Sequence, residues 1–188
     1  MFQVRIHGRG GQGVVTAAEL LSVAAFLDGK QAQAFPSFGP ERSGAPVVSF
    51  CRIDSRPIRL HEPIVEPDAI IVQDTTLLHS VDVFQGLSPH GFVILNSKKS
   101  FDELGLVDLV SRLPHAHARV VDATAAAEKH LGRPLSNVAL LGSFAALTGA
   151  VRLDSVMEAI TDRFRGKTRE GNAAAARAAY ELVTGGAA

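Results

Sequence analysis

An apolar segment, Val4 to His7, runs directly into a glycine-rich stretch at residues 8–13 (GRGGQG), and a helical pattern begins at Val14. Glycine tolerates positive φ and lets other atoms approach the backbone closely. The helix that follows points its unpaired N–H groups and its positive dipole end toward the loop. A strand, a tight glycine turn and a helix in this order predict a backbone cradle for an anionic group.

The glycine spacing Gly8-x-Gly10-x-x-Gly13 also matches the dinucleotide-binding fingerprint. That fingerprint requires an acidic residue at the end of the second strand, about 20 positions further on, to hold a ribose. Asp28 has the required separation but lies beside Gly29 at the end of the first helix, before the second strand. The loop therefore favours a phosphate or another anion over NAD. A tight turn that binds nothing, or that packs against a partner's backbone, stays open as the alternative.

Length and composition favour one soluble unit spanning residues 1–188. The formal net charge is zero, which argues against nucleic acid as a partner. Cys51 is the only cysteine, so the chain forms no internal disulfide and cannot supply the four thiolates of an iron–sulfur cluster. The chain begins with a strand, and no apolar run is long enough to span a bilayer, so we expect a cytoplasmic protein without membrane insertion.

The remaining pattern alternates apolar strands with helices. Strands are expected at residues 31–35, 47–53, 69–72, 92–95 and 119–121, and helices at residues 14–27, from 137 to 147 with Ser136 as cap, from 154, and at 168–184. A turn at residues 54–57 followed by a strand at 58–60 predicts a hairpin with residues 47–53. The fold class expected is α/β: a three-layer α/β/α, Rossmann-like, doubly wound, mostly parallel sheet with an antiparallel hairpin.

In such sheets, ligands bind beyond the carboxyl ends of the strands. His7, Asp74, Asn96 and Asp122 fall at those ends, although Asp74 and Asp122 are expected mainly to cap the helices that follow.

Residues 36–46 contain three prolines and two glycines, which predicts an irregular loop of the kind that often carries function. Phe38 is a candidate anchor there, unless the loop packs on its own aromatic rings. His115 and His117 lack a third nearby ligand, so no metal site is expected.

Two segments carry a resemblance to a known family. Residues 6–18 (IHGRGGQGVVTAA) resemble the amino-terminal signature of the gamma subunit of pyruvate:ferredoxin oxidoreductases, within the wider 2-oxoacid:acceptor oxidoreductases, and residues 34–47 (AFPSFGPERSGAPV) resemble the family's second signature. Looser similarities occur at residues 66–68, at Asn137 with Leu141-Gly142, and at Asn172. The resemblance runs from about residue 2 to residue 180.

The resemblance implies a function that the residues alone do not. Enzymes of this family decarboxylate a 2-oxo acid on thiamine pyrophosphate, pass electrons through iron–sulfur clusters to ferredoxin or another acceptor, and leave the acyl group on coenzyme A. A gamma-type chain is expected to pack against alpha, beta and delta-type subunits that carry thiamine pyrophosphate, Mg²⁺ and the clusters, to help bind coenzyme A, and to be inactive alone. The implied coenzyme-A-binding candidates are Gly8, Arg9, Gly10, Gly11, Gln12, Gly13, Glu41, Arg42 and Ser43, with no catalytic residue and no metal ligand.

Arg9 and the residues at positions 40–43 look closer to those of pyruvate-type subunits, while aromatic 2-oxo acids such as indolepyruvate or phenylglyoxylate stay open as substrates of the complex. Two alternatives of other classes are a stand-alone nucleotide-binding protein and a purely structural interaction module. The helix at residues 14–27 is apolar on most of its circumference, which predicts burial on more than one side and favours a partner surface.

Overall fold

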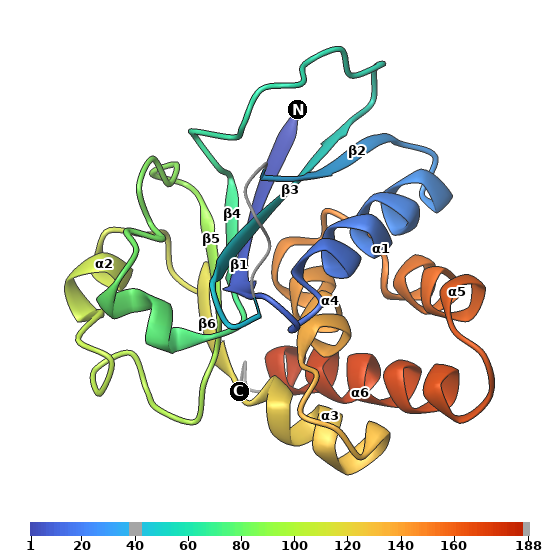
Figure 1. Cartoon of the computed structure of the whole chain (residues 1–188). Coiled ribbons are helices and arrows are strands. Elements are labelled where there is room, and N and C mark those ends of the chain that lie inside the picture. Colours follow the sequence, from blue (N-terminus) through green and yellow to red (C-terminus); the bar gives the residue numbers. More distant parts are fainter. Residues whose placement is uncertain (38–42, 186–188) are drawn as a thin grey trace.

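The computed structural model describes residues 1–37 and 43–185, and it has a central six-stranded sheet in the order β2-β3-β1-β4-β5-β6 (Figure 1). The strands are β1 (Phe2–Arg9), β2 (Gln31–Pro36), β3 (Pro46–Asp54), β4 (Ala69–Val72), β5 (Phe92–Asn96) and β6 (Ala118–Val121). The pairs β1–β4, β4–β5 and β5–β6 are parallel, whereas β3 is antiparallel to both β1 and β2. The sheet is therefore mixed, as the sequence predicts.

Helices cover both faces unequally. The helices are α1 (Val14–Leu27), the 3-10 helix η1 (Thr75–His79), α2 (Val107–Ser111), α3 (Ala123–Leu131), α4 (Asn137–Thr148), α5 (Leu153–Arg163) and α6 (Gly166–Thr184). Figure 1 shows α1 and α3 to α6 together on one side of the sheet, with α2 on the other. The expected three-layer α/β/α class is confirmed, with one thick helical layer and one thin one. No helix in the described ranges is long and apolar enough to cross a membrane.

The side chains on the two faces of the central strands belong to two separate apolar clusters. On β4, Ala69 and Ile71 face the thick helical layer, while Ile70 and Val72 face the thin layer. The neighbouring strand β5 alternates in the same way. Strands buried on both faces read as unbroken apolar runs, which is why these two strands were predictable from sequence.

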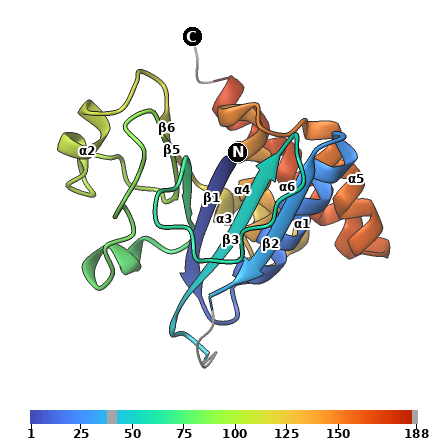
Figure 2. The same ribbon diagram turned by 90° about the horizontal axis from the view of Figure 1, so that it is seen from above.

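The antiparallel hairpin is not the one that the sequence predicts. Residues 58–60 form no strand, and β3 pairs with β2 and β1 instead. The side chain of Arg52 donates hydrogen bonds to the carbonyl oxygens of Leu60 (3.4 Å) and Glu62 (2.6 Å). Figure 2 shows this segment passing across β3 on its way to β4. The buried guanidinium of Arg52 thus holds residues 58–62 in place, whereas the prediction had residues 58–60 held by strand-to-strand hydrogen bonds to residues 47–53.

The apolar character of α1 is mostly explained by contacts within the chain. The helix packs against β2 and β3 of its own sheet and against α4 and α5. The exceptions are Val23 and Phe26, whose exposed fractions are 39% and 68%. A helix enclosed by a sheet and two helices needs apolar residues almost all round. Only this small patch remains for the partner surface that the sequence favours.

The predicted helix caps have different outcomes. Asp74 accepts a hydrogen bond from the Thr76 N–H at the start of η1, and Asp122 accepts one from the Ala125 N–H at the start of α3. Both predictions are confirmed. Ser136 is the N-cap residue of α4, at the predicted position, but its hydroxyl makes no capping hydrogen bond and accepts instead from the Asn96 side chain (3.1 Å).

Helices α4 and α6 of the thick layer pack closely against each other at Gly142. A Cβ at Gly142 would overlap the backbone carbonyl oxygen of Ala176. We expect Gly142→Ala to cost about 3 kcal/mol of unfolding free energy, because two buried helices must separate. Gly132→Ala is the control: Gly132 has φ 71° and nothing near its Cβ position, so only the left-handed backbone costs it about 1–2 kcal/mol. Urea denaturation of both variants measures the difference, and equal losses would contradict this account of the crossing.

Candidate functional site

The glycine-rich segment forms a tight turn between β1 and α1. The Gln12 N–H donates to the Arg9 carbonyl oxygen at 3.0 Å, and Gly11 and Gly13 adopt φ values of 93° and 71°. Gly13 also needs to be small, because a Cβ there would overlap the side-chain amide of Asn137. The turn thus depends on glycine for its backbone angles and for the approach of α4.

The first turn of α1 keeps its amide groups open. Gly13 is the N-cap residue and provides no capping side chain, and the N–H groups from Gly13 to Thr16 donate to no acceptor within the described residues. A hollow of about 310 Å³ lies beside them, lined by the turn, by α1 and by Val47. Open amides at the positive end of a helix stabilise a negative group. The open amides that the glycine pattern predicts are therefore present at the start of α1, and their binding of an anion stays a prediction.

The second predicted motif meets the first at its carboxyl-terminal end. Ser43 forms a bridge with Gly10, the Gly10 N–H donates to the Ala45 carbonyl oxygen (2.9 Å), and the Gly44 N–H donates to that of Gly10 (3.0 Å). The fold therefore brings Ser43 to the glycine turn, 33 positions away in sequence. The candidates Glu41 and Arg42, and the predicted anchor Phe38, lie outside the described residues.

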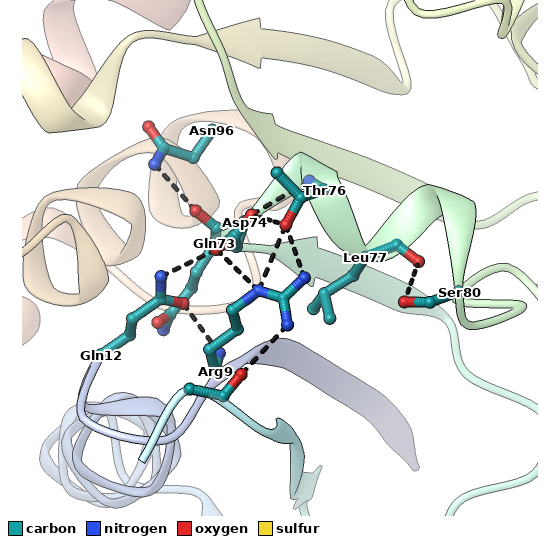
Figure 3. A network of polar contacts seen from close by, with 9 residues as sticks. Arg9, Gln12, Gln73, Asp74, Thr76, Leu77, Ser80 and Asn96 are labelled. Atoms are coloured by element: carbon teal, nitrogen blue, oxygen red, sulfur yellow. Dashed lines mark hydrogen bonds and ion pairs between the residues drawn. The ribbon is translucent and has the colours of Figure 1, made fainter.

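The side chain of Arg9 is bonded within the chain (Figure 3). Its guanidinium donates to Asp74 Oδ2 (3.2 Å), to Thr76 Oγ1 (2.7 Å) and to the Gly44 carbonyl oxygen (3.0 Å). Gln12 joins the same network, since its Nε2 donates to Asp74 Oδ2 (3.0 Å) and its Oε1 accepts from the Arg9 N–H (2.8 Å). The resemblance makes Arg9 a coenzyme-A-binding candidate, whereas in the structure its side chain joins three loops of the chain itself.

Asp74 is the centre of this network, and its side chain is mostly buried. Burial opposes its ionisation, but hydrogen bonds from Thr76 and Gln12 and the charge of Arg9 outweigh that effect, so the pKa of this carboxyl lies below its ordinary value. Asp74 is therefore a carboxylate at neutral pH and holds the β1–α1 turn against the start of η1.

Gln73, which the sequence analysis did not select, lies beneath the turn. The residue is 3% exposed, and neither polar atom of its side-chain amide has a hydrogen-bond partner in the described part of the chain. Its Oε1 lies 3.0 Å from the position that a Cβ on Gly8 would occupy. An orphaned buried amide is costly and needs an explanation. The one feature of the sequence that could have selected Gln73 is its position directly after the apolar strand at residues 69–72.

This place is the topological switch point of the sheet. After β1 the chain enters the thick layer through α1, and after β4 it enters the thin layer through η1. Beside it, Asn96 Nδ2 contacts the Gln73 carbonyl oxygen (2.9 Å) and Thr124 Oγ1 (2.8 Å), and Asn137 Nδ2 donates to the Gly13 carbonyl oxygen (3.1 Å). Ligands of doubly wound sheets bind at such points.

Other candidates have structural partners elsewhere. Asp28 lies at the end of α1 and not at the end of a strand, and its carboxylate accepts a hydrogen bond from the Arg152 side chain (2.7 Å). This position weakens the NAD interpretation further. His117 stacks on Phe92 at 4.0 Å between ring centroids. Cys51 is fully buried, and burial raises the pKa of its thiol to about 12, as expected for a small core residue.

Comparisons of the whole chain with known proteins agree on one family of oxidoreductase subunits. The family model for pyruvate ferredoxin/flavodoxin oxidoreductase matches residues 3–182. The chain is 52% identical to the pyruvate/ketoisovalerate oxidoreductases common subunit gamma of Pyrococcus furiosus, over 96% of each chain. It is 50% identical to the pyruvate synthase subunit PorC of Methanocaldococcus jannaschii, again over 96% of each. The crystal structure of the pyruvate oxidoreductase subunit PORC of Thermotoga maritima aligns with a TM-score of 0.80 at 35% identity, covering 96% of this chain and 95% of that one.

The chain belongs to the pyruvate ferredoxin/flavodoxin oxidoreductase family. The resemblance to gamma-type chains drawn from residues 6–18 and 34–47 is confirmed.

The network around Asp74 predicts a pH-dependent stability difference. Because the folded-state pKa of Asp74 lies below 3.8, its carboxylate stabilises the fold above about pH 4, and the contribution is lost as the pH falls through the folded pKa. We expect Asp74→Asn to lose about 1–3 kcal/mol of unfolding free energy at pH 7 and a smaller amount at pH 3, measured by urea denaturation.

The exposed Asp102 provides the control. Its side chain makes no ion pair within the described ranges, so Asp102→Asn should match the unsubstituted chain at both pH values. A loss for Asp74→Asn that is the same at pH 7 and pH 3 would show that the charge of Asp74 is not what holds the loops.

Proposed function

We propose that this chain is the gamma subunit of a thiamine-pyrophosphate-dependent 2-oxoacid:acceptor oxidoreductase complex. The complex oxidatively decarboxylates pyruvate: it releases CO₂, passes two electrons to the acceptor and transfers the acyl group to coenzyme A. The observation that carries the proposal is the match over nearly the full length of both chains to gamma subunits at 50–52% identity. The names of these relatives mention pyruvate and ketoisovalerate, which supports an aliphatic over an aromatic 2-oxo acid as the substrate of the complex. The chain acts as one gamma-type unit, residues 1–188, in the cytoplasm.

The redox and decarboxylation chemistry resides on partner chains. With one cysteine, which is buried, this chain cannot ligate an iron–sulfur cluster. No cluster of metal-binding side chains occurs among the residues described. In this proposal, as the family resemblance implies, alpha, beta and delta-type subunits carry thiamine pyrophosphate, Mg²⁺ and the clusters, and ferredoxin or a similar protein accepts the electrons.

The contribution of this chain is to help bind coenzyme A and to assemble the complex. Coenzyme A is a polyphosphorylated ligand, and the open N–H groups from Gly13 to Thr16 with the adjoining hollow fit one of its phosphates. The Arg9–Asp74 network fixes the turn, so these amides are oriented before the ligand arrives. Gly8, Gly10 and Gln12 shape the turn, and Ser43 closes its outer side.

Affinity purification of the tagged chain from its native host tests the subunit assignment. We expect larger subunits containing iron, sulfide and thiamine pyrophosphate to co-purify, with pyruvate-dependent reduction of ferredoxin that requires coenzyme A. The chain purified alone should be inactive. A chain that is isolated without partners, or that catalyses the reaction by itself, would contradict the proposal.

Coenzyme A binding to the purified complex tests the role of the turn. We expect Gly11→Ala to weaken binding about tenfold or more, because alanine strains the positive φ of the turn that orients the amides and adds a methyl group to the lining of the hollow. Gly105→Ala is the matched control, since both glycines have positive φ (93° and 68°) and open space at Cβ, and Gly105 lies outside the hollow. Titration calorimetry measures the two dissociation constants. If Gly11→Ala binds coenzyme A as tightly as Gly105→Ala, the turn does not contact the ligand.

A further inference from the structure

A groove of about 750 Å³ lies between α3 and the carboxyl-terminal part of α6, two helices that pack against each other (Figure 1). The helices are antiparallel there. A Cβ on Gly171, near the start of α6, would meet the backbone of His130 and Leu131 at the end of α3. At the opposite end, Gly185 lines the groove together with Asp122. The groove therefore follows the whole length of α3, and none of its residues belongs to the motifs at residues 6–18 and 34–47.

The floor of the groove is apolar and consists of small side chains. Ala125 and Ala126 of α3 line it together with Ala178 of α6. Leu182, one turn after Ala178, lines the same groove, and 57% of its surface is exposed. An apolar recess with a polar rim is typical of a protein–protein interaction site. Here the recess and a projecting leucine occupy one surface.

The charged side chains around the groove are separated by sign. Glu181 and Asp122 lie toward one end, whereas Lys129 and His130 lie at the other end of α3, about 10 Å away along the helix axis. Within residues 1–37 and 43–185, neither Glu181 nor Lys129 forms an ion pair, and Asp122 has one contact of 4.0 Å with the exposed Lys98. The groove thus has an acidic end and a basic end, each with a charge that no group of this chain neutralises.

Such a surface is complementary to a copy of itself. In a symmetric dimer the same patch of both subunits meets across a two-fold axis. An axis at right angles to the groove reverses its direction, so the acidic end of one copy lies opposite the basic end of the other. The rotation pairs Glu181 with Lys129 twice and brings each Leu182 toward the alanine floor of the other copy. The reverse alignment would oppose like charges, which is unfavourable.

We propose that the α3–α6 groove is an interface with a second copy of this chain. Leu182 supplies the apolar contact, and Glu181 of each copy pairs with Lys129 of the other. The inference goes beyond the proposed function, because it concerns only this chain and its copy. A complex that contains the chain would then hold it in pairs.

Sedimentation of the purified full chain over a range of concentrations measures the monomer–dimer dissociation constant. We expect Leu182→Glu, Lys129→Glu and Glu181→Lys each to raise this constant about tenfold or more, because the two-fold axis repeats every substitution. The double variant Lys129→Glu with Glu181→Lys exchanges the two ends and should restore most of the affinity. The controls are Lys99→Glu and Glu158→Lys, which change exposed charges outside the groove and should leave the constant unchanged.

The charge exchange keeps the test sharp, because a variant that is merely unstable would not be rescued by a second reversal. If the unsubstituted chain is monomeric over the whole concentration range, or if the double variant dimerises no better than the single ones, the proposed interface is overturned. If the single variants instead release a different subunit that co-purifies with the chain, the groove binds that subunit and not a second copy. Co-purification of thiamine- and iron-containing subunits is scored separately, so the proposed function stands or fails independently of the dimer.

Discussion

The contact between Gly13 and Asn137 is the constraint on which the functional edge of this protein depends. The Asn137 side chain donates to the Gly13 carbonyl oxygen and occupies the space that any Cβ at residue 13 would need. It therefore joins the N-termini of α1 and α4 at the carboxyl edge of the sheet. The hollow of about 310 Å³, a second hollow of about 630 Å³ lined partly by Gly13 and Asn137, and the open amides of α1 lie around this junction. A larger residue at position 13 would displace the Asn137 side chain from this contact as well as strain the turn.

The electrostatics of this edge divide into a closed part and an open part. On the side of η1, the charges of Arg9 and Asp74 pair with each other, and the network fixes the positions of the β1–α1 turn and of Gly44. On the side of α5 and α6, Arg133 and Lys167 have no carboxylate partner in the described part of the chain. Paired charges hold the backbone in place, and unpaired charges next to a hollow remain available for a ligand. The structure thus places the paired charges and the unpaired charges on opposite sides of this edge.

Some features were readable from the chain because they are local. The strand–turn–helix at residues 4–27, the unbroken apolar strands and the capping aspartates follow from backbone preferences and from short-range hydrogen bonds. The hairpin was assigned to the wrong segment because the side chain of Arg52, and not a turn signal, decides the path of residues 58–62. Gln73 was overlooked because only its burial without partners draws attention to it. The role of Arg9 could not be read, since its acceptors lie 35 and more positions away.

The sequence by itself determined that a helix N-terminus with glycine-freed amides lies at the end of the first strand, and that the chain is a gamma-type member of its family. Those conclusions depend on residue types at fixed short spacing. The tertiary structure alone decided that Arg9 is paired, that Ser43 meets Gly10, and that the ends of five helices enclose a cationic hollow. The physical reason is that contacts across such separations are set by how the helices pack on the sheet, and local preference carries no information about that packing.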